Sequence, residues 1–401
     1  MPRHIALCFL AFLAIAVAGL ATAVAYFISA LFTGLIGFNL FVSAITFGSI
    51  CFCISRAFAG LLAMSHPKRF GAAVSLVSMA AIAALLAYPT LSERFMPPDN
   101  NATSQVIEAL RLRTLALDTV QAGRSFEDLQ QLSSILQGKR IIALGEATHG
   151  TREFFQMKHR LLEFLVREMG VENFGMETSP EVAQVINDYI KNGSGNPRDV
   201  LYWPWATTEV MDMLDWMRAY NADPLTSRKI TFYGIDPTIG DRDRVMAINV
   251  GRILDQMGPE SKIVLWAHNA HISESKNRMG YFLKQQFGEQ AYLLGFEFDH
   301  GAFTSRMGTI HTYKVPPASP AYYAYALNKV GQPILLLDFQ TLSKDPVLAK
   351  WLEKDQSSHD FAELYAFFRL YPGGHTNYTS WLKLYDGVIF IEESTPAIGL
   401  R

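Results

Sequence analysis

The segment that decides the fold is Arg140-Ile-Ile-Ala-Leu-Gly-Glu-Ala-Thr-His-Gly-Thr-Arg-Glu-Phe154. A short apolar run ends at Gly145, and a carboxylate and an imidazole follow three residues apart, at Glu146 and His149. A helical pattern begins after Gly150. This order predicts a buried strand that delivers an acid–base pair to the edge of an α/β sheet.

A second segment has the same organisation, Ile263-Val-Leu-Trp-Ala-His-Asn-Ala-His-Ile272, and its apolar run ends in His268 and His271. Residues three apart on a regular strand face opposite sides, so the two rings converge only if the chain turns between them. Converging imidazoles are candidates for donors to a developing oxyanion or for metal ligands. Two strand ends that carry histidine indicate hydrolytic chemistry.

Apolar runs alternate with helical patterns along the rest of the chain. We expect strands at 141–144, 174–176, 230–233, 263–266, 292–296, 334–337 and 388–391. We expect helices at 154–169, 181–189, 210–220, 244–256, 281–287 and 321–329, with a lead-in helix over 105–120 and a short helix within 126–136. Strands that alternate with helices predict an α/β fold with a mostly parallel sheet covered on both faces.

The first ninety residues have the composition of membrane spans. None of the 37 acidic residues precedes Glu93, and three apolar runs occupy 5–27, 34–55 and 71–88. About 20 apolar residues cross the hydrocarbon core, so we expect three transmembrane helices in residues 1–90, in contact with the lipid bilayer. Arg56, Lys68 and Arg69 lie between the second and third runs. Their charge predicts a multi-pass protein of the bacterial inner membrane, with the following domain facing the periplasm or exterior.

Composition limits the chemistry of the remainder. Four of the 35 basic residues precede Glu93, which leaves a mildly acidic remainder without a basic surface for nucleic acid. The three cysteines, Cys8, Cys51 and Cys53, lie within the predicted spans, so the later domain has no disulfide and no cysteine nucleophile. The chain contains no G-x-S-x-G elbow, no phosphate-binding G-x-x-x-x-G-K-[ST] loop and no H-E-x-x-H helix.

Ligands of parallel sheets bind beyond the carboxyl ends of the strands, so polar residues at those ends are the candidates for a site. His149 is the leading candidate for a general base because imidazole titrates near neutral pH, although it is also suited to capping the next helix. Glu146 is suited to orienting His149 or holding a water molecule, and equally to stabilising the helix dipole.

Further candidates follow other predicted strands. Glu177 is expected to pair with Lys158 or Arg152, or to raise the basicity of a histidine, and a purely structural ion pair is an equal alternative. Asp236 precedes a proline that keeps it extended, and we place it behind the residues that meet substrate. Arg152, Lys158 and Asp236 are nevertheless candidate substrate contacts.

Two tryptophans lie in a proline-containing segment, Tyr202-Trp-Pro-Trp-Ala206. Trp203 and Trp205 are candidates to line an apolar substrate pocket, although aromatic residues near proline often serve packing alone.

Together these motifs resemble the erythromycin esterase family. The resemblance rests on Gly145-Glu-Ala-Thr-His-Gly-Thr-Arg-Glu-Phe-Phe155, Glu177, Tyr233-Gly-Ile-Asp236 and Trp266-Ala-His-Asn-Ala-His271, in this order. It extends from about residue 125 to 396 and does not include the predicted spans. The apolar runs and the resemblance together divide the chain into a membrane anchor at 1–90, a linker and lead-in helix at 91–124, and a hydrolase domain at 125–401.

The resemblance implies a three-layer α/β/α fold and an esterase acting on a small-molecule ester. Antibiotic-resistance members hydrolyse the lactone of macrolides with a histidine that activates water, and they generally require no metal, so we expect neither metal nor cofactor. The implied correspondence is the base at His149, the neighbouring acid at Glu146, the second glutamate at Glu177, the paired histidines at His268 and His271, and a basic helical residue at Lys158.

Two alternatives to this prediction remain. One is a metal-dependent hydrolase that uses Glu146, His149, His268 and His271 as ligands. The other is a non-catalytic binding module of the cell envelope.

Overall fold

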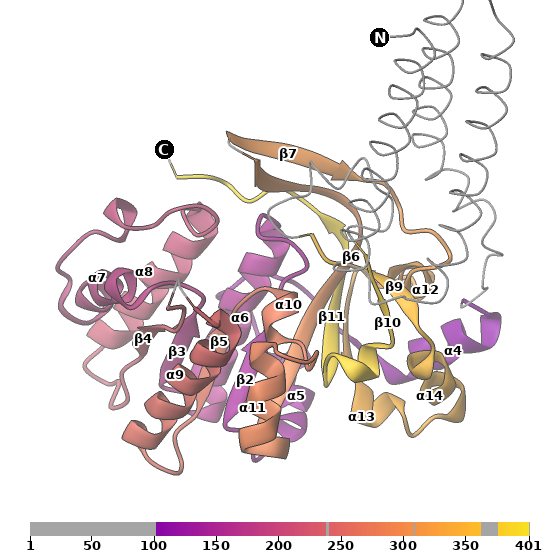
Figure 1. Cartoon of the computed structure of the whole chain (residues 1–401), viewed down its shortest axis with the longest axis horizontal. Coiled ribbons are helices and arrows are strands. Elements are labelled where there is room, and N and C mark those ends of the chain that lie inside the picture. The colour runs from indigo at the N-terminus through magenta and orange to yellow at the C-terminus, as the bar shows by residue number, and fades with distance from the viewer. Residues whose placement is uncertain (1–101, 238–239, 308, 362–375, 401) are drawn as a thin grey trace, which may run out of the picture. The chain divides into compact units, whose positions relative to one another are not determined.

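The computed structural model describes residues 102–400 except 238–239, 308 and 362–375 (Figure 1). The helices are α4 (Ser104–Arg113), α5 (Gln130–Ile135), α6 (Arg152–Met169), α7 (Pro180–Asn192), α8 (Thr208–Ala222), α9 (Arg242–Met257), α10 (Asn269–Ile272), α11 (Met279–Phe287), α12 (Tyr323–Asn328), α13 (Phe339–Leu342) and α14 (Pro346–Glu353). The strands are β1 (Leu115–Ala116), β2 (Ile141–Leu144), β3 (Asn173–Met176), β4 (Thr231–Gly234), β5 (Ile263–Trp266), β6 (Ala291–Met307), β7 (Thr309–Val315), β8 (Ile334–Asp338), β9 (Gln356–His359), β10 (Thr376–Thr379) and β11 (Gly387–Ser394). Four 3₁₀ turns complete the described elements: Glu127–Leu129, Pro197–Asp199, Gly288–Gln290 and Trp381–Lys383.

A nine-stranded sheet runs through the domain in the order β1-β8-β11-β6-β2-β5-β3-β4, with β7 paired to β6. The six strands from β11 to β4 are parallel to one another. Strand β1 pairs antiparallel with β8, β8 pairs antiparallel with β11, and β7 pairs antiparallel with β6. The predicted α/β fold with a largely parallel sheet is therefore confirmed. Strands β2, β3 and β5 end at the same edge, where the polar residues of the quoted motifs follow.

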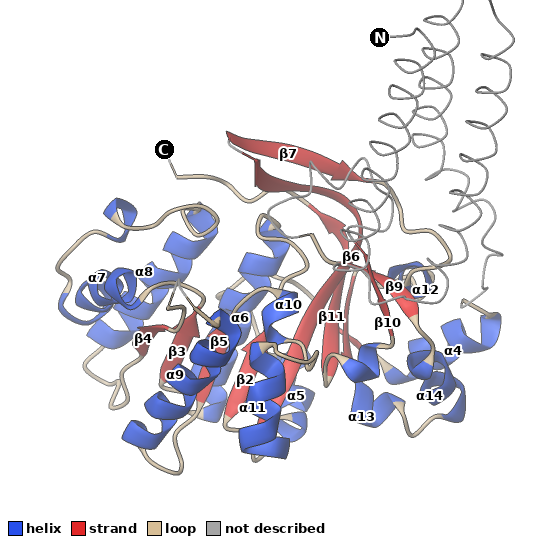
Figure 2. Ribbon diagram, viewed as in Figure 1, coloured by secondary structure: helices blue, strands red, loops and turns tan. Residues whose placement is uncertain are grey.

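Two hydrophobic cores lie on opposite faces of this sheet, because successive strand residues point to opposite sides. Ile142 and Leu144 of β2 join the core that contains α5, α6, α7 and α8. Ile141 and Ala143 join the core that contains α4, α9, α11, α12 and α14. Figure 2 shows helices on both sides of the strands, an arrangement consistent with three α/β/α layers.

Strand β6 is much longer than the predicted 292–296. It has 17 residues, and beyond Gly301 it leaves the parallel sheet to pair with β7 (Figure 1). A side chain at Gly301 would meet the Ser394 carbonyl oxygen at 2.1 Å, and its φ of +126° suits only glycine. The sequence analysis missed β7 because its pairing to β6 leaves nearly all of it exposed, without a buried apolar run.

The lead-in helix also differs from the prediction. Helix α4 ends at Arg113 instead of continuing to residue 120, because Thr114 is extended and its hydroxyl donates to the Leu110 carbonyl. The next two residues, Leu115–Ala116, pair with β8. Sheet pairing therefore overrides the helical spacing of the apolar residues in this segment.

The three predicted membrane spans, 5–27, 34–55 and 71–88, lie outside the described residues. Among the residues that the structure describes, no helix combines the length and apolarity needed to cross a bilayer. The 18-residue α6 approaches the necessary length but contains charged residues throughout, including Lys158, Arg160 and Glu163. This finding contradicts the predicted localisation, a multi-pass inner-membrane protein with an outward-facing domain, and that prediction is corrected.

Candidate active site

The loop after β2 is held close to its neighbours by two glycines. A side chain at Gly145 would meet the Asn269 side-chain oxygen at 2.1 Å, and one at Gly150 would meet the Thr304 carbonyl at 2.0 Å. The Gly145 N–H donates to the Leu294 carbonyl of β6 at 2.8 Å. These contacts fix the loop that carries Glu146 and His149 between the ends of neighbouring strands.

Glu146 is fully buried, and its carboxylate accepts from three side chains. His149 Nδ1 lies 2.8 Å from Oε1, while Lys158 Nζ at 2.6 Å and Trp266 Nε1 at 2.8 Å meet Oε2. The three partners come from the loop, from α6 and from β5. Glu146 is thereby fixed in position and orients the imidazole of His149.

His149 turns its second ring nitrogen away from Glu146. Because Nδ1 bonds the carboxylate, the neutral ring carries its lone pair on Nε2. Burial opposes the charged ring, but the hydrogen bond and charge of Glu146 and the charge of Glu177 outweigh burial and raise the pKa of His149. The ring centroid of His149 lies 4.7 Å from that of His268.

Lys158 does not meet solvent, contrary to its prediction as a substrate contact. Its ammonium group is fully buried on Glu146 and lies 4.4 Å from the centroid of the Trp266 ring. Burial lowers the pKa of Lys158 to about 8, although the charge and hydrogen bond of Glu146 oppose the shift. Lys158 therefore supports the acid–base pair from behind.

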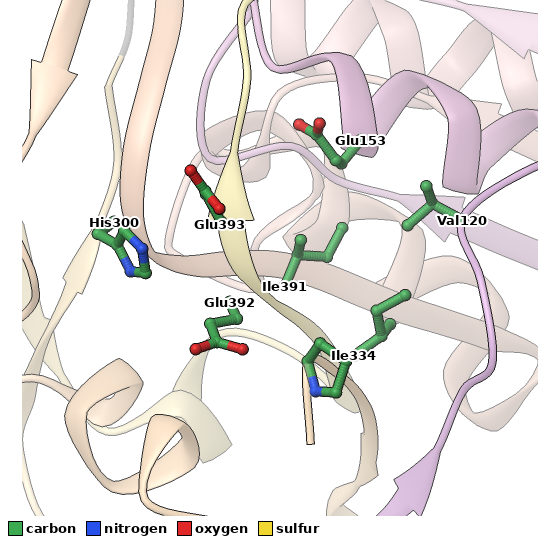
Figure 3. A pocket seen from close by; sticks show the side chains of 8 residues that line it. Val120, Glu153, His300, Ile334, Ile391, Glu392 and Glu393 are labelled. Carbon is green, nitrogen blue, oxygen red and sulfur yellow. The ribbon is translucent and has the colours of Figure 1, made fainter. Parts of the chain in front are cut away.

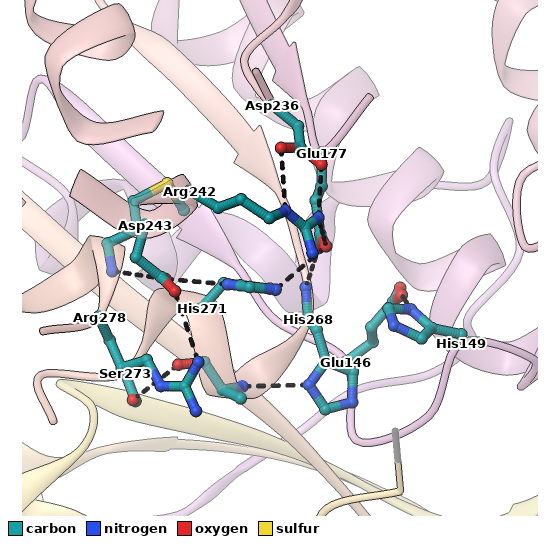
Figure 4. Close-up of polar contacts among 12 residues, drawn as sticks. Glu146, His149, Glu177, Asp236, Arg242, Asp243, His268, His271, Ser273 and Arg278 are labelled. Atoms are coloured by element: carbon teal, nitrogen blue, oxygen red, sulfur yellow. Dashed lines mark hydrogen bonds and ion pairs between the residues drawn. The ribbon is translucent and has the colours of Figure 1, made fainter. Parts of the chain in front are cut away.

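A second charged cluster surrounds Glu177, at the end of β3 (Figure 4). Its Oε1 lies 3.2 Å from the Arg242 guanidinium and 3.1 Å from His271 Nε2, and its Oε2 accepts the backbone N–H of His268 at 3.0 Å. Burial favours the neutral acid, yet the charge and hydrogen bond of His271 lower the pKa of Glu177. Arg242 also binds both oxygens of Asp236, which accounts for the contact of that predicted site residue.

Both ring nitrogens of His271 meet carboxylates. Nε2 faces Glu177 and Nδ1 lies 2.9 Å from Asp243. Burial disfavours the charged ring, but the two carboxylates prevail and raise the pKa of His271 to about 10. His271 is therefore an imidazolium with both N–H groups occupied. Donation to a substrate oxygen would require it to give up one of these bonds.

His268 has the opposite arrangement. Its Nδ1 accepts the N–H of Ala270 at 3.2 Å and caps the short helix α10, so the hydrogen of the neutral ring lies on Nε2. Burial, followed by the charge of His149, lowers the pKa of His268 well below its ordinary value. Its Nε2 is buried and has no hydrogen-bond partner among the described residues. The turn at Asn269 brings His268 and His271 into one site, as convergence requires.

The predicted aromatic residues border the same ring. The centroids of Trp203 and Trp205 lie 5.8 Å and 5.9 Å from that of His149. Trp205 is buried and donates through Nε1 to the Glu177 carbonyl at 3.3 Å, so it also has a packing role. The partly exposed Arg152, by contrast, pairs with Glu209 at 3.2 Å instead of with Glu177.

The sequence analysis missed Arg242, Asp243, Arg278 and Asp360. The first two follow the Asp236 strand end within Gly240-Asp-Arg-Asp-Arg244, a charged run at a helix start that could have identified them. Arg278 lies 3.4 Å from Asp243. Asp360 follows β9, which has no apolar run, and it meets His268 only through the tertiary fold.

A hollow of about 330 Å³ lies apart from these residues (Figure 3). It is lined by Val120, Glu153, His300, Pro333, Ile334, Ile391, Glu392 and Glu393. None of the predicted site residues lines it. The convergence of acid, base and unpartnered donor therefore locates the candidate site better than this hollow does.

Comparison with known proteins identifies relatives of this chain. The family model for erythromycin esterase matches residues 166–241 and 237–394, a region that includes Glu177, His268 and His271 and begins after His149. Erythromycin esterase type II of Escherichia coli is 33% identical over 118 residues, which are 28% of this chain and 27% of that protein. YbfO of Bacillus subtilis (strain 168), named as a candidate hydrolase, is 20% identical over 408 residues, covering 69% of this chain and 89% of that protein. The aligned part is thus a small share of the E. coli enzyme, whereas most of YbfO is spanned.

Solved structures show the same fold. A succinoglycan biosynthesis protein has a TM-score of 0.62 and 23% identity, over 73% of this chain and 98% of that protein. A histidine-to-asparagine mutant of the erythromycin esterase EreC, in its open conformation, has a TM-score of 0.54 and 14% identity, over 71% of this chain and 98% of that one. The family model and the named relatives support an ester hydrolase. The chain belongs to the erythromycin esterase family.

Proposed function

We propose that this protein hydrolyses an ester bond with a water molecule that His149 deprotonates. The observation that carries the proposal is the Glu146–His149 contact of 2.8 Å at the end of a parallel strand, with Nε2 turned away from the carboxylate. A neutral imidazole in this position accepts a proton from water, and Glu146 stabilises the imidazolium that forms. General base catalysis of this kind contributes about 10²–10⁴-fold to the rate.

Attack on the ester carbonyl produces an oxyanion that needs hydrogen-bond donors. His268 is the best-placed candidate because its Nε2–H is buried, unpartnered among the described residues and beside the ring of His149. His271 is better suited to holding Glu177, which in turn accepts the backbone N–H of His268. We therefore assign the oxyanion to His268 and a positioning role to His271, Glu177 and Arg242.

The substrate that the names of the relatives suggest is a macrolide lactone, which would make the protein an antibiotic-resistance enzyme. The rings of Trp203 and Trp205 beside His149 offer an apolar wall to such a molecule. Arg152 and Asp236 remain candidates for polar contacts at the rim, whereas Lys158 would act only through Glu146.

A metal-dependent hydrolase is the alternative to this proposal. Within the described ranges, no group of three or more His, Cys, Asp or Glu residues has an arrangement that could hold a metal ion. Glu146 and His271, two of the candidate ligands, instead bind several side chains of the protein. Turnover should persist after exhaustive chelation, and loss with recovery on stoichiometric Zn²⁺ would favour the metal mechanism.

The direct test is the His149→Asn variant, assayed against a panel of macrolides and simple esters. Asparagine preserves a polar side chain of moderate size at a loop position but cannot accept a proton near neutral pH. We expect kcat to fall by at least about 10²-fold on any ester that the parent cleaves. The acid limb of kcat/KM, which should lie above the ordinary histidine range because the pKa of His149 is raised, should vanish. Near-parental turnover would exclude His149 as the base, and absence of turnover by the parent on every ester would favour a binding module.

A further inference from the structure

Asp360 reaches the candidate site through backbone contacts of the next residue. The Phe361 N–H donates to the Ala147 carbonyl at 2.6 Å, and Phe361 forms an isolated parallel bridge with Thr148. Both partners belong to the loop between Glu146 and His149. Asp360 is therefore held against the loop that carries the proposed base, although it lies more than 200 residues away in the sequence.

The carboxyl group of Asp360 approaches the ring of His268 from the side opposite the free donor. Oδ1 lies 3.4 Å from Nδ1, and this oxygen is buried without a hydrogen-bond partner among the described residues. Burial raises the pKa of Asp360 to about 6, while Arg278, His149 and His271 lower it and Glu297 raises it. Burial, followed by the charges of Asp360 and Glu297, raises the pKa of Tyr385 well above its ordinary value. A buried oxygen that lacks a partner in the resting state is suited to a contact made during the reaction.

Asp360 and His268 together are able to hold one mobile proton. In one form the carboxyl group is protonated and the imidazole is neutral; in the other the carboxylate faces an imidazolium. The pair titrates as a unit in either description. Both forms retain the hydrogen on His268 Nε2, so the proposed oxyanion donor is present in each.

We propose that Asp360, acting through His268, supplies the proton that the leaving alcohol takes up. This inference rests on the proposed ester hydrolysis. The oxygen of water bonds to the carbonyl carbon, and its proton passes to His149 Nε2. When the bond from that carbon to the leaving oxygen breaks, the leaving oxygen takes the Nε2 proton of His268. The Asp360 carboxyl proton passes to His268 Nδ1, which gives up its hydrogen bond from the Ala270 N–H. His149 then releases its proton to solvent, His268 Nε2 takes up a proton from solvent, and the Nδ1 proton returns to Asp360, so the protein returns to its initial state.

The site would thus contain two carboxyl–imidazole pairs with their rings 4.7 Å apart. Glu146 and His149 form the base pair, and Asp360 and His268 form the acid pair. Asp360 is a positioning residue in this scheme, because it touches His268 and not the substrate. Its role should therefore depend on how strongly the leaving group needs a proton.

The test compares two substrates with one acyl group, ethyl butyrate and 4-nitrophenyl butyrate, in the full-length chain. The alkoxide of ethanol requires protonation to leave, whereas 4-nitrophenolate leaves without it. Asp360→Asn should lower kcat/KM for the ethyl ester by about 10²-fold, the low end for loss of proton transfer, and for the nitrophenyl ester by less than about 3-fold. Asp360→Glu, which retains a proton, should restore the ratio of the two activities toward that of the parent.

Matched variants separate this inference from the proposed function. Asp299→Asn alters another buried carboxylate that pairs with an imidazole, His300 at 2.9 Å, and should affect both esters equally. His149→Asn should reduce both activities strongly. If His149→Asn acts as expected but Asp360→Asn lowers both esters equally, or neither, the role of Asp360 is refuted and the esterase proposal stands. If His149→Asn retains turnover, or if the parent cleaves neither these two esters nor any macrolide or simple ester of the panel, the esterase proposal itself fails.

A measurement on the parent alone covers the case in which Asp360→Asn does not fold. Loss of the shared proton at high pH should lower kcat/KM for the ethyl ester while leaving the nitrophenyl ester nearly unchanged. A ratio of the two activities that does not change with pH would overturn the inference.

Discussion

Helix α6 carries two buried cations two positions apart, and each meets a carboxylate at 2.6 Å. Lys158 binds Glu146 at the edge of the sheet that carries the candidate active site. Arg160 binds Asp128 and also donates to the carbonyls of Thr119 and Ser125. The second pair closes a structural contact between α6 and the segment 119–128, which precedes α5. In the first pair, the carboxylate is shared with an imidazole that retains an available lone pair.

This comparison shows that burial and distance do not distinguish a functional ion pair from a structural one. The difference lies in what else the partners bind and in whether the cation is able to lose its proton. Lysine shifts its pKa readily when buried, whereas arginine remains charged. The Lys158–Glu146–His149 arrangement is therefore responsive to pH, and the Arg160–Asp128 pair should be inert.

The largest loss of stability is expected for Asp128→Asn. The variant leaves Arg160 buried and without its countercharge, and loss of one partner of a buried pair costs about 3–5 kcal/mol. The loss should be constant across neutral pH because arginine stays protonated. Denaturant unfolding between pH 6 and pH 9 would measure it. A loss that disappears at high pH would contradict the structural assignment, and parental kcat in the surviving folded protein would support it.

Glu146→Gln should destabilise the protein less than Asp128→Asn does, because Lys158 is able to deprotonate once its partner is gone. The loss should shrink as pH rises, since the pKa of Lys158 is already lowered to about 8. Burial has the largest influence on the pKa of His149 and lowers it, and in the variant the charge of Glu146 no longer opposes this effect. The acid limb of kcat/KM should therefore move to lower pH. Parallel unfolding and pH–rate series would check both effects. An unchanged acid limb would show that Glu146 does not control His149.

His271 should make the folded protein sensitive to alkaline pH. Its pKa is about 10 in the folded state and 6.5 ordinarily, so its stabilisation is complete below about pH 6.5 and is lost as pH rises toward 10. His271→Gln should flatten that decline and lower the unfolding free energy at pH 6 by roughly 2–4 kcal/mol. Parent and variant curves that remain parallel from pH 6 to pH 10 would argue against an imidazolium at this position.

The smallest effect on stability is expected for His159, a residue of α6 that takes no part in the candidate active site. Burial lowers its pKa to about 4, and its Nε2 has no hydrogen-bond partner among the described residues. The unfolded chain binds the proton more readily, so stability should fall as pH drops from about 6.5 to 4. We compare the unfolding free energy of His159→Leu with that of the parent at two pH values. The difference should favour the variant by about 1–2 kcal/mol more at pH 5 than at pH 8. An equal difference at both pH values would contradict a neutral buried imidazole.

Local patterns predicted the strands that lead into the candidate active site better than the segments around them. Strands β2 and β5 have the predicted bounds, because each is a buried parallel strand whose apolar run stops where the sheet ends. The same reasoning located Glu146 and His149 on one loop and His268 at the end of a neighbouring strand. It failed for β7 and for the segment at Asp360, where pairing or a single backbone contact replaces an apolar run.

The roles within the site depended on partners distant in sequence. The spacing of His268 and His271 treats the two residues alike, yet one ring caps a short helix and keeps a free Nε2 while the other bridges Glu177 and Asp243. Lys158 is a candidate substrate contact in the sequence because the resemblance assigns it to a basic residue on the helix after the motif. Its position on α6 instead directs it into the sheet, against Trp266.

The sequence by itself determined the α/β class, the parallel core and the polar residues at the carboxyl ends of its strands, because hydrophobic periodicity and strand-end polarity are local properties. The tertiary structure decided which nitrogen of each histidine is available, which cation serves Glu146 and that Asp360 reaches His268. Protonation and hydrogen-bond partners depend on burial and on charges brought together from separate elements, and no spacing along one chain encodes them.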